Sequence, residues 1–391
     1  MGPRTASVEP KFVDPELRQT QANQPTVPVW DRFVRTFHWG LVGGIAAAFA
    51  TSLLLPPRWT LVHAIVGGIS ASLVLTRLVW GVFGPTYARF SSFVRGPRRV
   101  AAYGRELLHG TAPRHLGHNP AGAAMIVALL SGVLLVAVSG AMTLGGALRF
   151  GPLAAVMDYA SGSIARELHE VVAYTLLALI GAHVLGVIFE SRRTHENLAR
   201  AMVLGCKESR PHDDVPSPIR SRTGIAAVVG VALIGTVAVA AVAMAAREPK
   251  GIPAASLDPT YKKECGECHI AYHPSLLPSD RWAAVMDGLA RHFGENAALP
   301  AATSQAIRSY LTANAAETVD TLPANELRTA NPTDPLRISA TPFWTHTHHE
   351  IDPATFKAKP VRSKSNCAAC HGDAETGMFQ PWNIQIPVPQ P

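Results

Sequence analysis

The most regular feature of the chain is a series of long apolar stretches separated by polar segments. Five of them are long enough to cross a bilayer core of about 30 Å as helices. They cover residues 37–55, 59–83, 121–148, 168–189 and 224–246. Any single run of this kind is also compatible with a buried core helix, but the fifth has Thr236 as its only strongly polar side chain. The pattern predicts an all-α membrane protein.

Beyond residue 246 the apolar runs stop and the pattern becomes that of a small soluble domain. Amphipathic helices are expected over residues 280–293 and 303–315. Residues 321–342 are rich in proline and asparagine, which predicts loops. This part is therefore expected to be mostly α-helical and irregular.

The distribution of charge predicts how the chain crosses the membrane. The composition, 48% hydrophobic and 16% charged, already indicates a partly membrane-embedded protein. Five Lys and Arg precede the first run, six lie in residues 85–118 and seven in residues 190–223. By the positive-inside rule these three segments are cytoplasmic, so the fifth helix leads to the periplasm. From Arg247 onward there are 13 basic and 15 acidic residues, which argues against a nucleic-acid partner despite the net charge of +7.

The first 30 residues are polar and carry charges of both signs, so we expect no signal peptide there. The first helix would then direct insertion into the bacterial inner membrane, with the N-terminus in the cytoplasm. Cys206 falls in the last cytoplasmic segment, where a reduced thiol is expected. No role is assigned to it.

Two Cys-x-x-Cys-His motifs lie in the part beyond the fifth helix. They consist of Cys265, Cys268 and His269, and of Cys367, Cys370 and His371. In c-type attachment two thiols bond covalently to the porphyrin edge, and the adjacent imidazole takes one axial position on the iron. The repeated motif predicts two haem c groups, with His269 and His371 as proximal ligands.

Zinc and thioredoxin-like redox chemistry are the alternatives for paired cysteines. The interval between the two pairs is far longer than common zinc modules use, and zinc does not require histidine after both pairs. A redox pair explains the cysteines but not the repeated histidine, and no βαβ pattern surrounds either motif. Haem c therefore fits the motifs best.

Four histidines lie within or at the ends of the first four apolar runs: His38, His63, His169 and His183. A lone membrane histidine is compatible with a helix–helix hydrogen bond, but polar groups at this depth are costly and usually functional. His169 and His183 are nearly four helical turns apart, so they share a face about 21 Å apart along the axis. Matching by depth pairs His183 with His38 on the cytoplasmic side, and His169 with His63 on the periplasmic side. Each pair is suited to hold a haem b between two imidazoles, which favours electron transfer.

The sequence around these histidines resembles bacterial cytochrome b561, a relative of the hydrogenase b-type subunits. The resemblance is carried by the run Val29–Trp39, by Leu61-Val62-His63, by Gly117-His118-Asn119-Pro120 and by the two histidines of the fourth helix. It implies a four-helix transmembrane bundle that holds two b haems through His38, His63, His169 and His183 and exchanges electrons with quinone. Arg77 also matches an arginine common in the family, where it would either neutralise a haem propionate or snorkel towards water.

Three more histidines, His109, His115 and His118, lie in the basic loop before the third apolar run. Asn119 followed by Pro120 has the pattern of an N-cap with proline at the first helical position. We therefore expect His118 to serve helix entry rather than ligation.

Each c-type iron also needs a sixth ligand. The candidates are His273, His292, His346, His348 and His349, with Met286 and Met378 as thioether options. Residues 276–297, and the stretch from His348 to His371, resemble the dihaem cytochrome c family. That resemblance implies bis-histidine haems with His292 and His348 as distal ligands, while which of them serves which haem stays open. His273 departs from the family, whose members more often have proline there.

The two resemblances together imply a membrane-bound multihaem electron-transfer protein. Electrons would pass between quinone or quinol, two b haems, two c haems and a periplasmic partner such as a small soluble cytochrome c or another redox protein. This is quinol:cytochrome c-type oxidoreductase chemistry. The direction of electron flow stays open. No separate catalytic residue is assigned. The alternatives are a superoxide:quinone oxidoreductase activity of the b-type part and a purely anchoring role for its helices.

The expected organisation, in contact with membrane lipid over its middle part, has five segments. They are a polar cytoplasmic tail (1–28), a cytochrome b561-like four-helix membrane domain (29–205), a cytoplasmic linker (206–223), a fifth transmembrane helix (224–246) and a periplasmic dihaem cytochrome c domain (247–391). The last is expected to gain much of its core from the porphyrins themselves.

Overall fold

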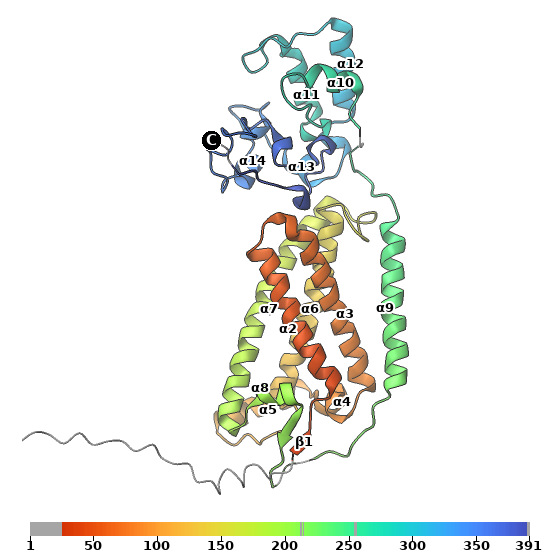
Figure 1. Ribbon diagram of the computed structural model, residues 1–391, viewed down its shortest axis with the longest axis vertical. Coiled ribbons are helices and arrows are strands. Elements are labelled where there is room, and N and C mark those ends of the chain that lie inside the picture. The colour runs from red at the N-terminus through yellow and green to blue at the C-terminus, as the bar shows by residue number, and fades with distance from the viewer. Residues whose placement is uncertain (1–25, 212, 214, 254–255, 389–391) are drawn as a thin grey trace, which may run out of the picture. The chain divides into compact units, whose positions relative to one another are not determined.

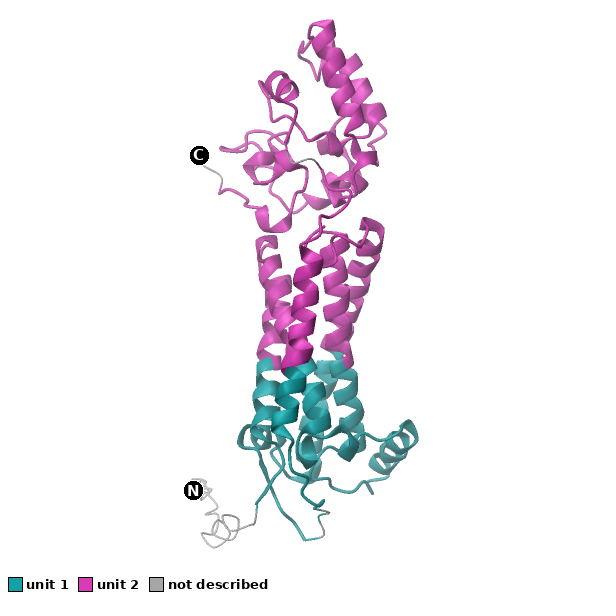
Figure 2. Cartoon of the chain, turned by 90° about the vertical axis from the view of Figure 1, so that its right-hand side faces the viewer, with its two compact units in different colours: residues 1–40, 75–130, 178–230 teal, residues 41–74, 131–177, 231–391 magenta. Residues whose placement is uncertain are grey.

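The computed structural model describes residues 26–388 except residues 212, 214 and 254–255. The predicted tail therefore lies almost wholly outside the described residues. The chain divides into two compact units (Figure 2). Unit 1 comprises residues 1–40, 75–130 and 178–230, and unit 2 comprises residues 41–74, 131–177 and 231–391.

Among the described residues, five helices are long and apolar enough to cross a membrane. They are α2 (Arg32–Leu53), α3 (Thr60–Phe83), α6 (Pro120–Gly146), α7 (Tyr159–Thr194) and α9 (Thr223–Ala245) (Figure 1). Each unit holds one portion of α2, α3, α6 and α7, and within each unit these portions lie side by side (Figure 2). The predicted all-α membrane fold with a four-helix bundle is confirmed.

The starts of two membrane helices are fixed by side-chain caps. Val34 N donates to Asp31 Oδ1 at 2.9 Å at the start of α2. Gly122 N donates to Asn119 Oδ1 at 2.7 Å at the start of α6, so the predicted N-cap is confirmed. Such caps satisfy backbone N–H groups that have no partner inside the helix.

Unit 1 also contains a pair of strands that the hydrophobic pattern does not predict. β1 (Thr26–Pro28) pairs antiparallel with β2 (Cys206–Glu208). The backbone N–H groups of Val29 and Trp30 both donate to Gly205 O at 2.9 Å. The shorter elements of this unit are η2 (Thr86–Ala88), α4 (Phe90–Phe93), α5 (Pro97–Leu108) and α8 (Leu198–Leu204). The strand pair thus ties the entry to α2 to the segment that follows α8, at the beginning of the predicted linker.

The part of unit 2 beyond α9 consists of short helices and turns. The α-helices are α10 (Pro259–Cys265), α11 (Ser279–Asp287), α12 (Ala301–Ala313), α13 (Leu322–Glu326) and α14 (Pro342–Thr347). Single 3-10 turns are η3 (Pro274–Leu276), η4 (Leu289–Arg291), η5 (Ala316–Thr318), η6 (Ile338–Ala340), η7 (Cys367–Ala369), η8 (Ala374–Thr376) and η9 (Pro381–Asn383), and η1 (Pro57–Trp59) precedes α3. A buried cluster that includes Trp282, Ile307 and Leu311 joins α11 to α12.

Two expectations for this part need correction. The helix expected over residues 280–293 ends at Asp287, because Gly288 follows and the chain continues into the 3-10 turn η4. The segment expected to form only loops, residues 321–342, contains α13. Its N-cap is Thr321, whose side chain accepts from Ala324 N, and Pro323 stands in its first turn. Proline in the first turn of a helix is favourable, so the proline signal there marked a helix start.

Candidate functional site

In unit 2, α3 and α7 bring the rings of His63 and His169 close together. Their ring centroids are 6.0 Å apart and the ring planes cross at 81°. Nδ1 of His63 lies 3.0 Å from Ala48 O. Nδ1 of His169 lies 2.9 Å from Val136 O. Because a carbonyl oxygen can only accept, each Nδ1 carries the hydrogen, and each Nε2 keeps a lone pair for a metal.

The separation of these rings can be compared with the requirement of a six-coordinate iron. Metal–imidazole bonds are about 2 Å long, so two imidazoles on opposite faces of one metal hold their ring centres roughly 6 Å apart. The observed 6.0 Å between His63 and His169 matches this spacing. The pair therefore fits a haem b with two axial imidazoles.

A glycine that the sequence did not draw attention to makes room for one of these rings. A Cβ placed on Gly140 of α6 would lie 3.0 Å from Cε1 of His169. Contacts this short are tighter than ordinary van der Waals distances, so the ring lies against the bare backbone of α6. The adjacent Ser139 places its Oγ 3.3 Å from His169 Nδ1. A Ser-Gly pair inside an apolar helix is the signal that would have pointed to this position.

The other membrane pair, His38 and His183, lies in unit 1. The two side chains are close enough to interact electrostatically. Nδ1 of His38 is buried and has no hydrogen-bond partner among the described residues. The ring of Trp39 contacts that of His38 edge-on at 5.1 Å between centroids. The structure thus brings the rings of His63 and His169 together and places His38 and His183 within electrostatic range of each other.

Arg77 and His118 also belong to unit 1. Arg77 is 3% exposed, donates from Nη2 to Ala88 O at 3.1 Å and lies 4.9 Å from the centre of the Phe90 ring. This burial argues against the snorkelling alternative, which would leave the guanidinium in water. Arg77 Nη1 and His118 Nδ1 are both buried without a hydrogen-bond partner among the described residues. The unpaired guanidinium donor of Arg77 suits an anionic group such as a haem propionate.

The first Cys-x-x-Cys-His motif has a histidine facing it. The rings of His269 and His292 are 6.1 Å apart and nearly parallel, at 29°. Nδ1 of His269 lies 2.7 Å from Ile270 O, which again leaves Nε2 free. Burial lowers the pKa of His292, with a contribution from His269. The neutral, ligating form of this imidazole is therefore favoured.

The second motif has the same arrangement. The rings of His348 and His371 are 6.1 Å apart, with an angle of 67° between them. Nδ1 of His348 lies 2.8 Å from Trp344 O, and its ring stacks on the Trp344 indole at 4.3 Å. Burial lowers the pKa of both His348 and His371. Each motif is thus paired with one of the two histidines that the family resemblance implied.

The other candidate sixth ligands have different surroundings. His273 is 2% exposed, and its Nδ1 lies 2.8 Å from Ser275 Oγ. His346 and His349 stack on each other with 5.7 Å between ring centroids. Met286 packs in the buried cluster of α11 and α12. None of these contacts brings the side chain to a motif histidine.

The motif cysteines are free thiols in the structure. Burial raises the pKa of Cys265 and of Cys367 to about 11, so both are protonated at neutral pH. Among the described residues, no three His, Cys, Asp or Glu side chains converge to hold a metal ion without a cofactor. The thiols of each motif are therefore available for covalent attachment.

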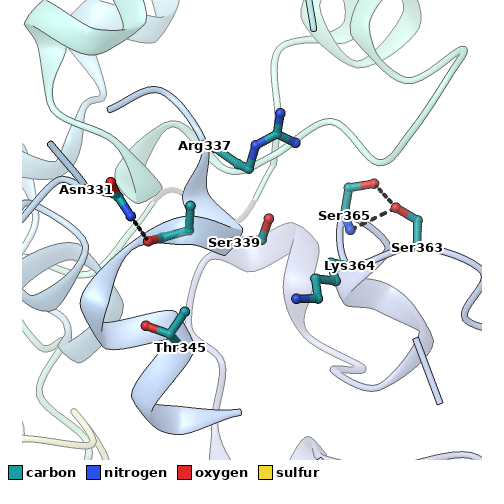
Figure 3. Close-up of a pocket in the computed structure, with 8 residues that line it drawn as sticks. Asn331, Arg337, Ser339, Thr345, Ser363, Lys364 and Ser365 are labelled. Carbon is teal, nitrogen blue, oxygen red and sulfur yellow. Dashed lines mark hydrogen bonds between the residues drawn. The ribbon is translucent and has the colours of Figure 1, made fainter. Parts of the chain in front are cut away.

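A cavity of about 410 Å³ is lined mostly by polar residues of the segments 331–345 and 363–365. Figure 3 shows Arg337 and Lys364 among its lining residues. The Arg337 guanidinium lies 4.7 Å from the ring of Phe293, the neighbour of His292. The Lys364 ammonium lies 5.2 Å from the ring of Trp344, which stacks on His348. The cavity therefore has one basic group beside each c-type pair.

Comparison with known proteins identifies both parts of the chain. Residues 29–205 match prokaryotic cytochrome b561, and residues 261–379 match dihaem cytochrome c. A solved dihaem cytochrome c from Rhodobacter sphaeroides is 45% identical, over 31% of this chain and 94% of its own, with a TM-score of 0.27. A dihaem cytochrome c from Shewanella baltica is 34% identical, over 33% of this chain and 92% of its own, with a TM-score of 0.27. A comparison with curated proteins gave no match.

These matches define a membrane electron-transfer cytochrome. The chain belongs to the dihaem cytochrome c family over residues 261–379, where it is 45% identical to a relative that it covers almost completely. Residues 29–205 match prokaryotic cytochrome b561. The predicted fusion of these two families is confirmed. Its cofactors are haem b and two haem c.

Proposed function

We propose that the chain is a four-haem relay that carries electrons between the quinone pool and a soluble periplasmic acceptor such as a small cytochrome c. The observation that carries this proposal is the repeated separation of facing imidazoles. It is 6.0 Å for His63 and His169, and 6.1 Å for both c-type pairs. One chain thus offers the same two-imidazole coordination in its membrane helices and beside both covalent attachment motifs.

The proposed ligands follow from these pairs. One b haem is held by His38 and His183, and the other by His63 and His169. The first c haem is bound by Cys265 and Cys268 with His269 and His292 as axial ligands, and the second by Cys367 and Cys370 with His371 and His348. Arg337 and Lys364 are placed to receive propionates in the polar cavity.

The protein's contribution is to fix and shield the ligands. Haem supplies a reversible one-electron change at iron. Two imidazoles on one iron would leave no position open for oxygen, which favours electron transfer over oxygen chemistry. The carbonyl oxygens of Ala48 and Val136 hold His63 and His169 in one tautomer, and the apolar helices exclude water. Rigid ligands keep reorganisation small when charge arrives or leaves.

The orientation that we propose places the c-type part in the periplasm of a bacterial inner membrane. The Lys and Arg counts of the connecting segments support it. Oxidation of one quinol releases two electrons and two protons, and each electron reduces one iron. The released electrons would leave one at a time to the soluble partner.

The test is anaerobic mixing of the purified protein with quinol while b and c absorption bands are followed separately. We expect a 2:2 ratio of b to c haem and reduction of b bands before c bands. His63→Ala and His169→Ala should abolish quinol-driven reduction of the c haems, whereas dithionite should still reduce them. Reduction of the c haems that is unchanged in these variants would leave the membrane helices as a simple anchor.

The same preparation also tests the superoxide alternative. Superoxide consumption that requires the b sites and quinone but survives Cys367→Ala and Cys370→Ala would favour a superoxide:quinone oxidoreductase. C bands that never reduce with quinol would overturn the relay.

A further inference from the structure

One short segment of unit 2, residues 379–385, packs directly on the second c-type site. The ring of Phe379 lies 5.0 Å from that of His371. Gln385 N donates to Cys370 O at 2.8 Å. The segment therefore touches both an axial ligand and a covalent attachment residue of this site.

The same segment contacts the loops at one end of the unit 2 membrane helices. Gln380 Nε2 donates to Leu148 O at 2.7 Å. The ring of Trp382 lies 5.0 Å from that of Phe150. The turn η9, which contains Trp382, also packs against η1. Leu148 and Phe150 belong to the connection between α6 and α7, and η1 leads into α3.

These loops continue directly into the helices that carry the His63–His169 pair. His63 comes four residues after the end of η1, and His169 ten residues after the start of α7. At the rise of an α-helix these ligands lie about 6 Å and about 15 Å along their helices from the contacted ends. The contacts thus join the surroundings of this membrane pair to those of the second c-type site.

A second group of contacts joins the α6–α7 connection and the start of α7 to residues beyond α9. Tyr159 Oη donates to Glu326 Oε1 at 2.5 Å, and Tyr159 N donates to Asp320 Oδ2 at 2.9 Å. The guanidinium of Arg149 donates to Lys250 O and lies 3.8 Å from the Asp320 carboxylate. Both charged and apolar contacts therefore fix the α6–α7 connection to the part of the chain beyond α9.

The first c-type site is surrounded by different segments. The ring of Tyr272 packs on His269 at 5.1 Å, and the ring of Phe293 packs on His292 at 4.9 Å. Phe293 is 49% exposed. A large aromatic side chain that is half exposed beside an axial ligand suits contact with another redox protein.

From these contacts, and resting on the proposed relay, we infer that the two c-type sites act in series with the second motif first. An electron from the His63–His169 site reaches the His348–His371 site, and then the His269–His292 site, where the soluble acceptor docks. At each step one ferrous iron is oxidised and one ferric iron is reduced by a single electron, and no bond forms or breaks. If the net flow is reversed, the order is reversed with it.

The contact surface is tested by a cross-link in the haem-loaded protein. In a Cys206→Ser background, Phe150→Cys and Trp382→Cys are introduced together, and disulfide formation is read by electrophoresis and mass spectrometry. Phe150→Cys with Ser309→Cys, on α12, is the matched control. We expect a cross-link in the first variant and none in the control; no cross-link in the first variant would overturn the inference.

The order is tested with variants in which one c-type site can be read separately. His292→Met and His348→Met, made one at a time, change the spectrum and raise the potential of the altered site. After rapid mixing with quinol, or in a parallel run with a flash-activated, membrane-soluble reductant, the His348–His371 site should be reduced first in both variants. Reduction of the His269–His292 site first would overturn the series. If quinol does not reduce the c-type sites but the flash-activated reductant reduces them in the expected order, the proposed function would be overturned instead.

Discussion

Burial fixes the protonation state of His118, the residue before the N-cap of α6. Its ring packs against those of Trp30 and Phe93, at 4.5 and 4.6 Å between centroids. Burial lowers the pKa of His118 to about 3, and the neighbouring charges of Arg77 and Lys207 contribute in the same direction. The folded protein therefore holds a neutral imidazole here throughout the physiological range.

This buried histidine should make the protein sensitive to acid. Above pH 6.5 the imidazole is neutral in both the folded and the unfolded chain, so it contributes no pH dependence. As the pH falls below 6.5 the unfolded chain takes up a proton that the folded chain does not bind until about pH 3. The free energy of unfolding should fall by up to about 1.4 kcal/mol per pH unit in this window. His118→Gln should flatten this fall, measured as the melting temperature of the detergent-solubilised protein from pH 7 to 4.

A matched control for this measurement is His109→Gln. His109 lies at the C-cap of α5 and is exposed. Its replacement should leave the acid sensitivity as it is in the parent protein. Equal pH profiles for the parent and for His118→Gln would contradict the assignment of the effect to His118.

At the scale of elements, the contact between α6 and α7 is set by Gly140. A methyl group at this position would lie 3.0 Å from Cε1 of His169. Overpacking of this kind costs about 1–3 kcal/mol, so Gly140→Ala should weaken haem binding at the His63–His169 site by roughly tenfold. The measurement is the ratio of b to c haem in the purified variant, and the potential of the b haem that remains.

Gly67 of α3 offers the comparison, because a Cβ there meets nothing within 4 Å. Gly67→Ala should keep the b to c ratio of the parent. If Gly140→Ala also keeps that ratio, the close approach of α6 to His169 is not needed for cofactor binding.

The same helices show what the sequence can and cannot predict. The apolar run 168–189 located the fourth crossing, but α7 begins at Tyr159, because residues such as Ala160, Ala165 and Glu167 favour a helix without being apolar enough to mark a bilayer. Hydropathy thus finds the part of a helix that suits the membrane, not its ends. The fourteen-residue spacing of His169 and His183 was enough to predict that they share one helix face at two depths in the membrane, because helix geometry is regular.

Other features depended on contacts between distant segments, which a single sequence does not reveal. The strands β1 and β2 are three residues each and pair across most of the b561 part. The acceptors that orient His63 and His169 are backbone carbonyl oxygens, and every residue has one. Which distal histidine faces which motif likewise had to come from the fold, since both candidates lie between the two motifs in sequence.

At the scale of the whole molecule, the arrangement of basic segments predicts on which side of the membrane each part lies. The three segments rich in Lys and Arg include the stretch with Cys206, which lies on β2 and is exposed. The four motif thiols lie beyond α9 and are expected to be consumed by haem attachment. Cys206 should then be the one reactive thiol of the mature protein, and its side of the membrane can be read chemically.

Intact spheroplasts provide that measurement. Because the positive-inside rule places residues 190–223 in the cytoplasm, Cys206 should react with a membrane-permeant maleimide but not with an impermeant one. Cys206→Ser with Ser309→Cys moves the thiol to an exposed position of α12, beyond the fifth helix, and should react with both reagents. Labelling of Cys206 by the impermeant reagent would place residues 190–223 in the periplasm and contradict the proposed orientation. The c-type part would then lie in the cytoplasm, where a periplasmic acceptor cannot reach the His269–His292 site.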